Sequence, residues 1–147
     1  MRVFWSGIVT LPLLLALTAC GPILMIPGGE LGGTVTAAPD DWSFTDEVGT
    51  VQLETRPGDP YSVNIWCTSI DGQLMIGTDR STAWAGYIAA DPRVRLRVDG
   101  AIYELVATPT VDPRDAAAFQ AAIVAKYDYE PDPEQQATAV QFWLSPR

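Results

Sequence analysis

The chain has 147 residues, of which 48% are hydrophobic and 18% charged, and its nine basic and eighteen acidic side chains give a net charge of −9. This charge argues against a nucleic-acid-binding protein, because such proteins need clustered positive charge to contact phosphates. With no histidine and two cysteines, the chain lacks the residues for Ser-His-Asp hydrolysis, Cys-His proteolysis and the common zinc sites. We expect no metal site, since no loop has carboxylates at calcium-binding spacing.

The N-terminal segment is apolar and ends in small residues. Arg2 precedes an apolar run that serine, glycine, threonine and proline interrupt, so the run is short for a membrane span. The stretch LTAC at residues 17–20 resembles the lipobox of bacterial lipoproteins. That resemblance implies a signal peptide over residues 1–19 and acyl chains on Cys20, whose methylenes would anchor the protein stably. The alternative is an ordinary buried cysteine in a short anchor helix.

Removal of the signal peptide would leave 128 residues, enough for one domain but not for two. Arg2 leaves with the signal, so the mature chain has eight basic and eighteen acidic side chains, a net charge of −10. The position after the lipidated cysteine is Gly21, and this resembles lipoproteins that are sorted to the outer membrane. We therefore expect a lipid-anchored envelope protein that faces the periplasm. Glycine and proline in residues 20–40 predict a tether whose later part lies against the domain, which spans residues 41–147.

The first folded elements are a strand and a hairpin. Residues 51–55 alternate as a strand, with Val51, Leu53 and Thr55 on one face. Asp71-Gly72 predicts a two-residue turn that pairs Ile70 with Gln73, Cys67 with Ile76, and Ile65 with Thr78. The expected core face of this hairpin is Tyr61, Val63, Ile65, Cys67, Leu74 and Ile76. The opposite face carries Asn64, Trp66, Thr68, Met75, Gly77 and Asp79. Because side chains alternate along a strand, we expect this second face to contact something other than that core.

A short helix and a second hairpin follow. Trp84, Tyr87 and Ile88 have helical spacing, with Ser81 or Thr82 as the cap and Pro92 marking the end. Asp99-Gly100 closes the second hairpin. Its expected core face is Val94, Leu96, Val98, Ala101, Tyr103 and Leu105. Its other face carries Arg93, Arg95 and Arg97, with Glu104 across from Arg95 as an expected ion-pair partner. The arginine stripe is either an anion site or, as we favour, a partly paired outer face.

A second helix and a last strand complete the pattern. The helix runs from residue 113 to about 126, with Asp112 as the N-cap and Asp115 at the capping-box position. Its buried stripe is Ala116, Phe119 and Ile123. The stretch DYEPDPEQQ predicts a loop, and the last strand directs Val140, Phe142 and Leu144 inward. Five strands and two short helices in this order favour a small, mostly antiparallel barrel.

These elements carry a resemblance to a known family. The succession VQLETRPGDPYSVNIWCTSIDGQLMIGT and AWAGYIAADPRVRLRVDGAIYELVA, with a late helix and strand, resembles the pyridoxamine 5′-phosphate oxidase-like split β-barrels over residues 42–145. This superfamily includes flavin reductases and deazaflavin-dependent nitroreductases. The resemblance implies a mostly β fold: an antiparallel split barrel of about six strands with two short helices. It also implies a homodimer that holds flavin mononucleotide (FMN) or a deazaflavin across its interface.

The resemblance further implies positions for the cofactor. Its ring would lie beside Asn64, Trp66 and Thr68, and its phosphate or ribityl chain near Thr78, Arg80, Ser81 and Thr82. Backbone amides, an arginine and two hydroxyls can hold a phosphate. The chain departs from the family in having Arg80 as the single basic residue there, beside Asp79.

Two functions are therefore expected. The slightly favoured one is a lipid-anchored, non-catalytic binding or scaffold domain of the cell envelope. The alternative is a flavin- or deazaflavin-dependent oxidoreductase, whose chemistry belongs to the cofactor ring and requires no catalytic side chain. Cys67 lies in an apolar run, which favours a small buried hydrophobe over a reactive thiol.

Overall fold

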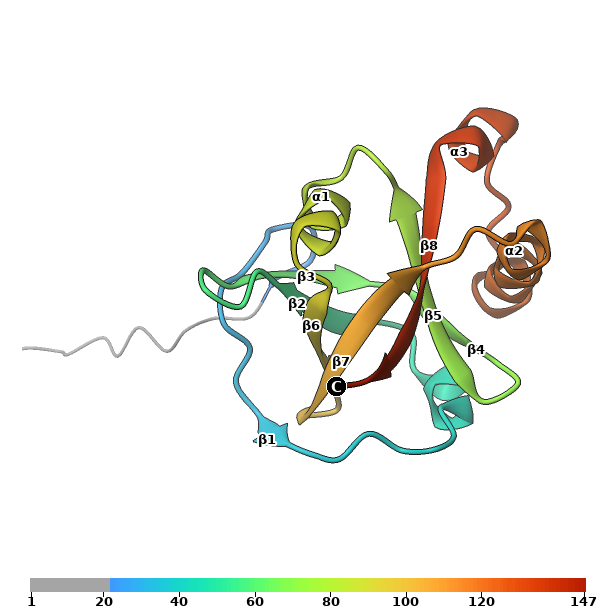
Figure 1. Cartoon of the computed structure of the whole chain (residues 1–147). Helices are drawn as coiled ribbons and strands as arrows, with labels where there is room; N and C mark the ends of the chain where they lie inside the picture. The colour runs from blue at the N-terminus through green and yellow to red at the C-terminus, as the bar shows by residue number, and fades with distance from the viewer. Residues whose placement is uncertain (1–21) are drawn as a thin grey trace, which may run out of the picture.

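One sheet curls into a half-open barrel in the computed structural model, which describes residues 22–147 (Figure 1). The sheet order is β3-β2-β6-β7-β8-β5-β4, with β1 beside β7. The strands are β1 (Thr34–Val35), β2 (Val51–Thr55), β3 (Tyr61–Ile65), β4 (Cys67–Ile70), β5 (Gln73–Asp79), β6 (Arg93–Val98), β7 (Ala101–Pro109) and β8 (Ala139–Pro146). The helices are the 3-10 helix η1 (Ser43–Glu47), α1 (Ala83–Ala90), α2 (Pro113–Tyr127) and α3 (Pro133–Thr138). The predicted mostly β split barrel is confirmed, with more strands and helices than expected.

Both Asp-Gly hairpins form in the predicted register. Asp71 and Gly72 have positive φ angles of 51° and 77°, and Asp99 and Gly100 have 47° and 84°. Two consecutive left-handed residues match the twist of the flanking strands, which is why these dipeptides close tight hairpins. Ile70 pairs with Gln73 and Cys67 with Ile76 across the first turn. Val98 pairs with Ala101 and Arg95 with Glu104 across the second.

The first hairpin is shorter than the sequence predicts. Ile65 does not pair with Thr78, because its partner is Val51 on β2. The chain leaves β3, at one end of the sheet, and enters β4, at the other end, through the single residue Trp66. Trp66 therefore stands at the corner where the chain crosses from one end of the sheet to the other.

The barrel core contains the inward faces of the strands and one face of α1. Its buried members include Val51, Leu53, Ile65, Cys67, Leu74, Ile76, Trp84, Ile88, Val94, Leu96, Val98, Leu105, Phe142 and Leu144. These include most of the residues that the alternation assigns to the core, although Tyr61, Val63, Tyr103 and Val140 are only partly buried. Cys67 is a buried free thiol, as expected, and burial raises its pKa.

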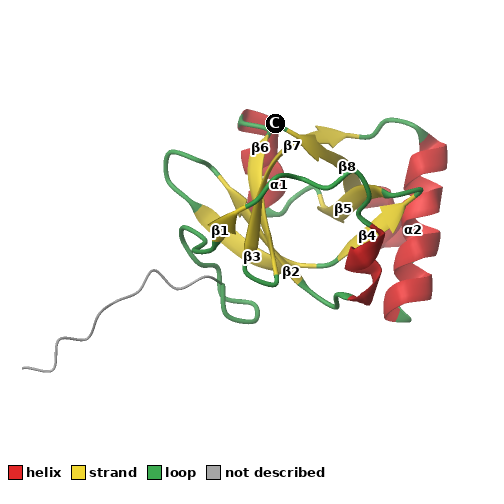
Figure 2. Ribbon diagram, turned by 90° about the horizontal axis from the view of Figure 1, so that it is seen from below, coloured by secondary structure: helices red, strands yellow, loops and turns green. Residues whose placement is uncertain are grey.

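The outer face of the first hairpin is covered by the chain itself. Thr68 and Met75 are 2% and 0% exposed, and α2 lies along the outer side of β4 (Figure 2). The helix buries Ile123 on this side, and its Phe119 lies against Gly77. A second small apolar layer, made by α2, therefore covers part of the face that we expected to contact something other than the barrel core.

The arginine stripe is paired throughout. Arg93 binds Asp91 at 2.6 Å, and Arg95 binds the buried Glu54 at 3.0 Å. Arg97 donates to the Gln52 side chain and to the Gly32 carbonyl. The predicted ion pair between Arg95 and Glu104 is wrong, although their register is right, because β2 places Glu54 on the other side of Arg95.

The segment before β2 packs on the barrel over part of its length. Gly28 forms a bridge to Ser62 on β3, and β1 pairs with β7 in parallel. Leu31 is 1% exposed, and its amide donates to Glu54. Within residues 22–147 no helix is both long and apolar enough to cross a bilayer. The predicted signal peptide and Cys20 lie outside the described residues.

The helix boundaries follow the predicted caps with two corrections. Asp112 caps α2 by accepting from the Arg114 amide, whereas Asp115 accepts from Thr110 and Trp143 rather than closing a capping box. The predicted loop at DYEPDPEQQ contains the start of α3, which a capping box between Asp132 and Gln135 begins.

Candidate functional site

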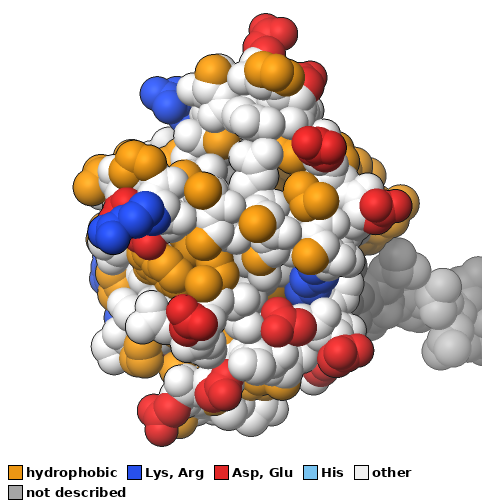
Figure 3. All heavy atoms as spheres, turned by 90° about the vertical axis from the view of Figure 1, so that its right-hand side faces the viewer, with side chains coloured by type: hydrophobic (Ala, Val, Ile, Leu, Met, Phe, Trp, Pro, Cys, Tyr) orange, Lys and Arg blue, Asp and Glu red, His pale blue; other side chains and the backbone are white. Residues whose placement is uncertain are grey.

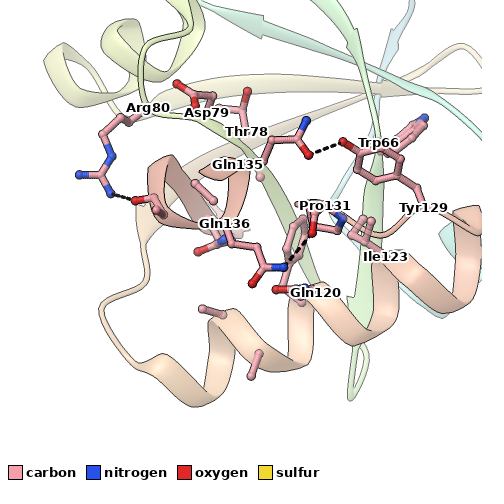
Figure 4. Close-up of a pocket in the computed structure, with 17 residues that line it drawn as sticks. Trp66, Thr78, Asp79, Arg80, Gln120, Ile123, Tyr129, Pro131, Gln135 and Gln136 are labelled. Carbon is pink, nitrogen blue, oxygen red and sulfur yellow. Dashed lines mark hydrogen bonds between the residues drawn. The ribbon is translucent and has the colours of Figure 1, made fainter. Parts of the chain in front are cut away.

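A cavity of about 640 Å³ lies between α2 and α3 on one side and β5 and β8 on the other (Figure 4). This volume is within the usual range for small-molecule pockets. Its walls combine aromatic, amide and small apolar side chains, and Asp79 and Arg80 are its two charged lining residues. Figure 3, which views the molecule from the side of α2 and α3, shows acidic and apolar side chains over much of this face.

An aromatic wall made of Trp66, Tyr127 and Tyr129 stands at one end of the cavity. The ring of Trp66 stacks on Tyr127 with centroids 4.4 Å apart and planes 10° apart, and meets Tyr129 edge-on at 5.4 Å. The Tyr127 hydroxyl donates to the Cys67 carbonyl, which holds the stack against the start of β4. Trp66 is 42% exposed, so a preformed indole surface is accessible to a planar ligand.

The polar groups of the cavity are mainly neutral amides. Gln135 accepts from the Tyr129 hydroxyl, and Gln136 donates to the Pro131 carbonyl (Figure 4). Within residues 22–147, the side-chain amides of Gln120 and Gln141 form no hydrogen bond to the protein and line the cavity. They provide donors and acceptors that a neutral ligand can use.

Gly77 forms part of the cavity floor. A Cβ atom there would lie 2.6 and 2.8 Å from two ring carbons of Phe119. The absence of a side chain therefore lets Phe119 of α2 lie directly on β5. Both residues line the cavity.

Gly77→Ala is expected to lower the free energy of unfolding by about 1–3 kcal/mol, because the added methyl overpacks the contact with Phe119. Urea denaturation measures the loss. The matched control is Gly86→Ala on α1, where an added Cβ meets nothing within 4 Å, and a stability gain of about 0.4–1 kcal/mol is expected. Equal effects of the two variants would contradict the overpacking.

One of the residues expected to hold a phosphate, Ser81, holds a carboxylate of the chain instead. The amide and the hydroxyl of Ser81 both donate to Asp79, at 2.8 and 2.6 Å. The Thr138 hydroxyl donates to the other carboxylate oxygen of Asp79. Hydrogen bonds from Ser81 and Thr138 lower the pKa of Asp79 to about 2, so its negative charge is present at neutral pH.

Arg80 is also engaged within the protein. Its guanidinium donates to the carbonyls of Thr138 and Ala137, at 3.1 and 3.5 Å, where α3 ends (Figure 4). A cation is favourable near the carbonyl end of a helix. Arg80 therefore joins the end of β5 to the end of α3.

The other predicted site residues are divided between two hollows, and Trp66 lines both of them. Asn64, Trp66, Thr78 and Thr82 line a smaller hollow of about 310 Å³, together with Leu24, Met25 and Ile26. Trp66, Thr78 and Arg80 line the larger cavity. Thr68 is buried beneath α2, and Ser81 lines neither hollow. Thr82 is the N-cap residue of α1, but its hydroxyl donates to the Asp79 carbonyl rather than accepting from the helix.

Sequence reasoning missed the contribution of α2 and α3 to the site. Phe119, Gln120 and Tyr129 line the cavity, although none was among the predicted site residues. The signal for α3 is the sequence Asp132-Pro133-Glu134-Gln135, an N-cap followed by proline and a capping-box glutamine.

The fold matches solved structures, whereas no family model and no curated protein matches the sequence. A conserved hypothetical protein, Rv2991 from Mycobacterium tuberculosis, superposes with a TM-score of 0.60 at 21% identity, over 76% of this chain and 86% of that one. A protein described as an F420 reductase gives a TM-score of 0.55 at 21% identity, over 75% and 95% of the two chains. A putative pyridoxamine 5′-phosphate oxidase from Listeria innocua gives 0.55 at 13% identity, over 69% and 86%.

The fold is that of the pyridoxamine 5′-phosphate oxidase-like split β-barrels. The likeness in these comparisons is one of fold, so the residues themselves decide whether a flavin phosphate fits. In this split barrel, Ser81 and Thr138 donate to Asp79, and Arg80 donates to α3. As arranged, these groups do not fit a phosphate, because an ionised carboxylate already occupies the donors of Ser81 and Thr138 and would repel a second anion.

Proposed function

We propose that the protein is a lipid-anchored domain of the bacterial cell envelope that binds an uncharged, planar small molecule without redox chemistry. One observation carries this proposal: Ser81, which belongs to the expected phosphate site, and Thr138 donate to the carboxylate of Asp79, which lines an aromatic cavity. The anchor would be acylated Cys20, and the domain would face the periplasm from the outer membrane.

The cavity supports a neutral ligand rather than an anion. Arg80 is committed to the end of α3, and the carboxylate of Asp79 is ionised at neutral pH. The remaining lining side chains are uncharged. A flat ring can stack on Trp66, while the amides of Gln120 and Gln141 fix its orientation.

Three related fluorescent probes test the proposal: lumichrome, a neutral flavin ring without a side chain, riboflavin, and FMN. We expect lumichrome and riboflavin to bind, and FMN to bind no more than about threefold tighter than riboflavin, because the phosphate finds no free donor. Titration followed by probe fluorescence gives the three dissociation constants. An FMN affinity at least about tenfold above that of riboflavin would reject the proposal.

The second candidate is a flavin- or deazaflavin-dependent oxidoreductase of the envelope. The fold favours it, since one similar structure is described as an F420 reductase. A bound cofactor would supply hydride transfer, and the barrel would orient it and exclude water. This candidate requires FMN or a deazaflavin to bind, and a homodimer that completes the site. Light scattering that returns a monomer would count against it.

A further inference from the structure

Residues 23–26, Ile-Leu-Met-Ile, form an exposed apolar turn. Their exposed fractions are 60% for Ile23, 82% for Leu24, 95% for Met25 and 68% for Ile26. Four consecutive large apolar side chains in water are unfavourable, and such patches mark contacts with a membrane or another protein.

The barrel holds this turn in place. Ile23 and Ile26 exchange two backbone hydrogen bonds of 3.1 and 2.8 Å. The Asn64 side chain on β3 donates to the Leu24 carbonyl at 2.9 Å and to the Pro22 carbonyl at 3.3 Å. Leu24 has a left-handed φ of 52°, which is unfavourable for leucine and needs such support. The turn is therefore an ordered part of the domain that exposes its apolar side chains.

The position of the turn in the chain identifies what covers it. It begins three residues after Cys20, so at most about 3.5 Å per residue, or roughly 10 Å, separates Ile23 from the expected lipid attachment point. Residues 21–29 contain no charged side chain, in a chain with eighteen acidic residues. A lipid on Cys20 would bring this uncharged, apolar stretch to the bilayer surface, where its side chains can leave water.

We propose that the turn Ile23–Ile26 inserts into the membrane interface and fixes the orientation of the domain. The proposal rests on the lipid anchoring proposed above and adds a second contact made by the folded domain. Asn64 then acts as a positioning residue that holds the turn toward the bilayer. The smaller hollow, lined by Leu24, Met25, Ile26 and Trp66, opens beside the inserted turn.

Cysteine accessibility in the full-length chain tests this orientation. Met25→Cys places a thiol in the turn. Val111→Cys is the matched control, because both native side chains are 95% exposed. Val111 belongs to the segment between β7 and α2, and this segment lies across the molecule from the turn (Figures 1 and 2). The native Cys67 is buried and does not compete for reagent.

Membranes opened by sonication are treated with a charged maleimide, with and without detergent. We expect Met25→Cys to react roughly fivefold or more slowly than Val111→Cys in membranes and equally fast in detergent, since the thiolate must meet the reagent in water. Equal rates in membranes overturn the inference. Protection of Met25→Cys that persists in detergent, or disulfide-linked dimers through it, identifies a protein surface instead and also overturns it. A chain recovered in the soluble fraction overturns the lipid anchoring together with the inference, whereas equal labelling of a membrane-bound chain overturns the inference alone.

Discussion

Replacement of Arg95 by leucine is expected to lower the free energy of unfolding by about 3–5 kcal/mol, because it leaves a buried carboxylate without its counter-ion. Glu54 on β2 is 3% exposed. Its two carboxylate oxygens accept from Arg95 at 3.0 and 3.1 Å, and one of them accepts from the Leu31 amide at 2.5 Å. In the Arg95→Leu variant the charge of Glu54 would keep only the amide contact.

Urea denaturation measures the loss, with Arg93→Leu as the control on the same strand face. The pair between Arg93 and Asp91 is solvent-exposed, with side chains 54% and 30% accessible, so its removal should cost less than about 1 kcal/mol. The double variant Arg95→Leu with Glu54→Leu should recover most of the loss, since both buried charges are then gone. A loss for Arg95→Leu no larger than that of the control would mean that Glu54 reaches water.

The parts of the fold that depend on neighbouring residues could be predicted from the sequence. The Asp-Gly dipeptides fix both turns, and alternation outward from each turn then assigns side chains to faces. The partner of Arg95 could not be predicted in this way. A strand has two neighbours, and the sequence shows only the hairpin partner that carries Glu104. Glu54 lies 41 residues away and meets Arg95 only when β2 pairs with β6.

The corner at Trp66 illustrates the same limit. Alternation from Tyr61 to Ile70 is typical of one continuous strand. No residue near Trp66 in the sequence indicates that the chain crosses there from one end of the sheet to the other. The candidate site was likewise only partly predictable. Asp79 was correctly placed on a strand, but the hydroxyl of Thr138 that binds its carboxylate comes from 59 residues away. The family resemblance implied a phosphate near the end of this strand, whereas a long-range hydrogen bond from Thr138 helps to hold the carboxylate of Asp79 there.

Asp79→Ala is expected to raise the affinity for FMN by about tenfold or more and to leave the affinity for riboflavin nearly unchanged. Removing the carboxylate frees the Ser81 amide and hydroxyl and the Thr138 hydroxyl. It also removes the negative charge of a carboxyl group whose pKa is held at about 2. Hydrogen bonds to a charged group are worth about 1.5–3 kcal/mol each, so even one new phosphate contact gives a factor of this size. Fluorescence titration of both flavins measures the ratio.

Asp41→Ala is a closely matched control for this gain. Ser43 donates to Asp41 through its amide and hydroxyl at 2.8 and 2.6 Å, the same local geometry that Ser81 forms with Asp79. Asp41 does not line the cavity, so its removal changes the net charge of the protein by the same amount without opening donors there.

An equal gain in FMN affinity in both variants would assign the effect to net charge. A gain confined to Asp79→Ala would mean that the carboxylate occupies a position in which the barrel can still bind a phosphate. No gain in either variant would mean that the Asp79–Ser81 contact is only a local turn, and the proposal of a ligand without phosphate would lose the observation that carries it.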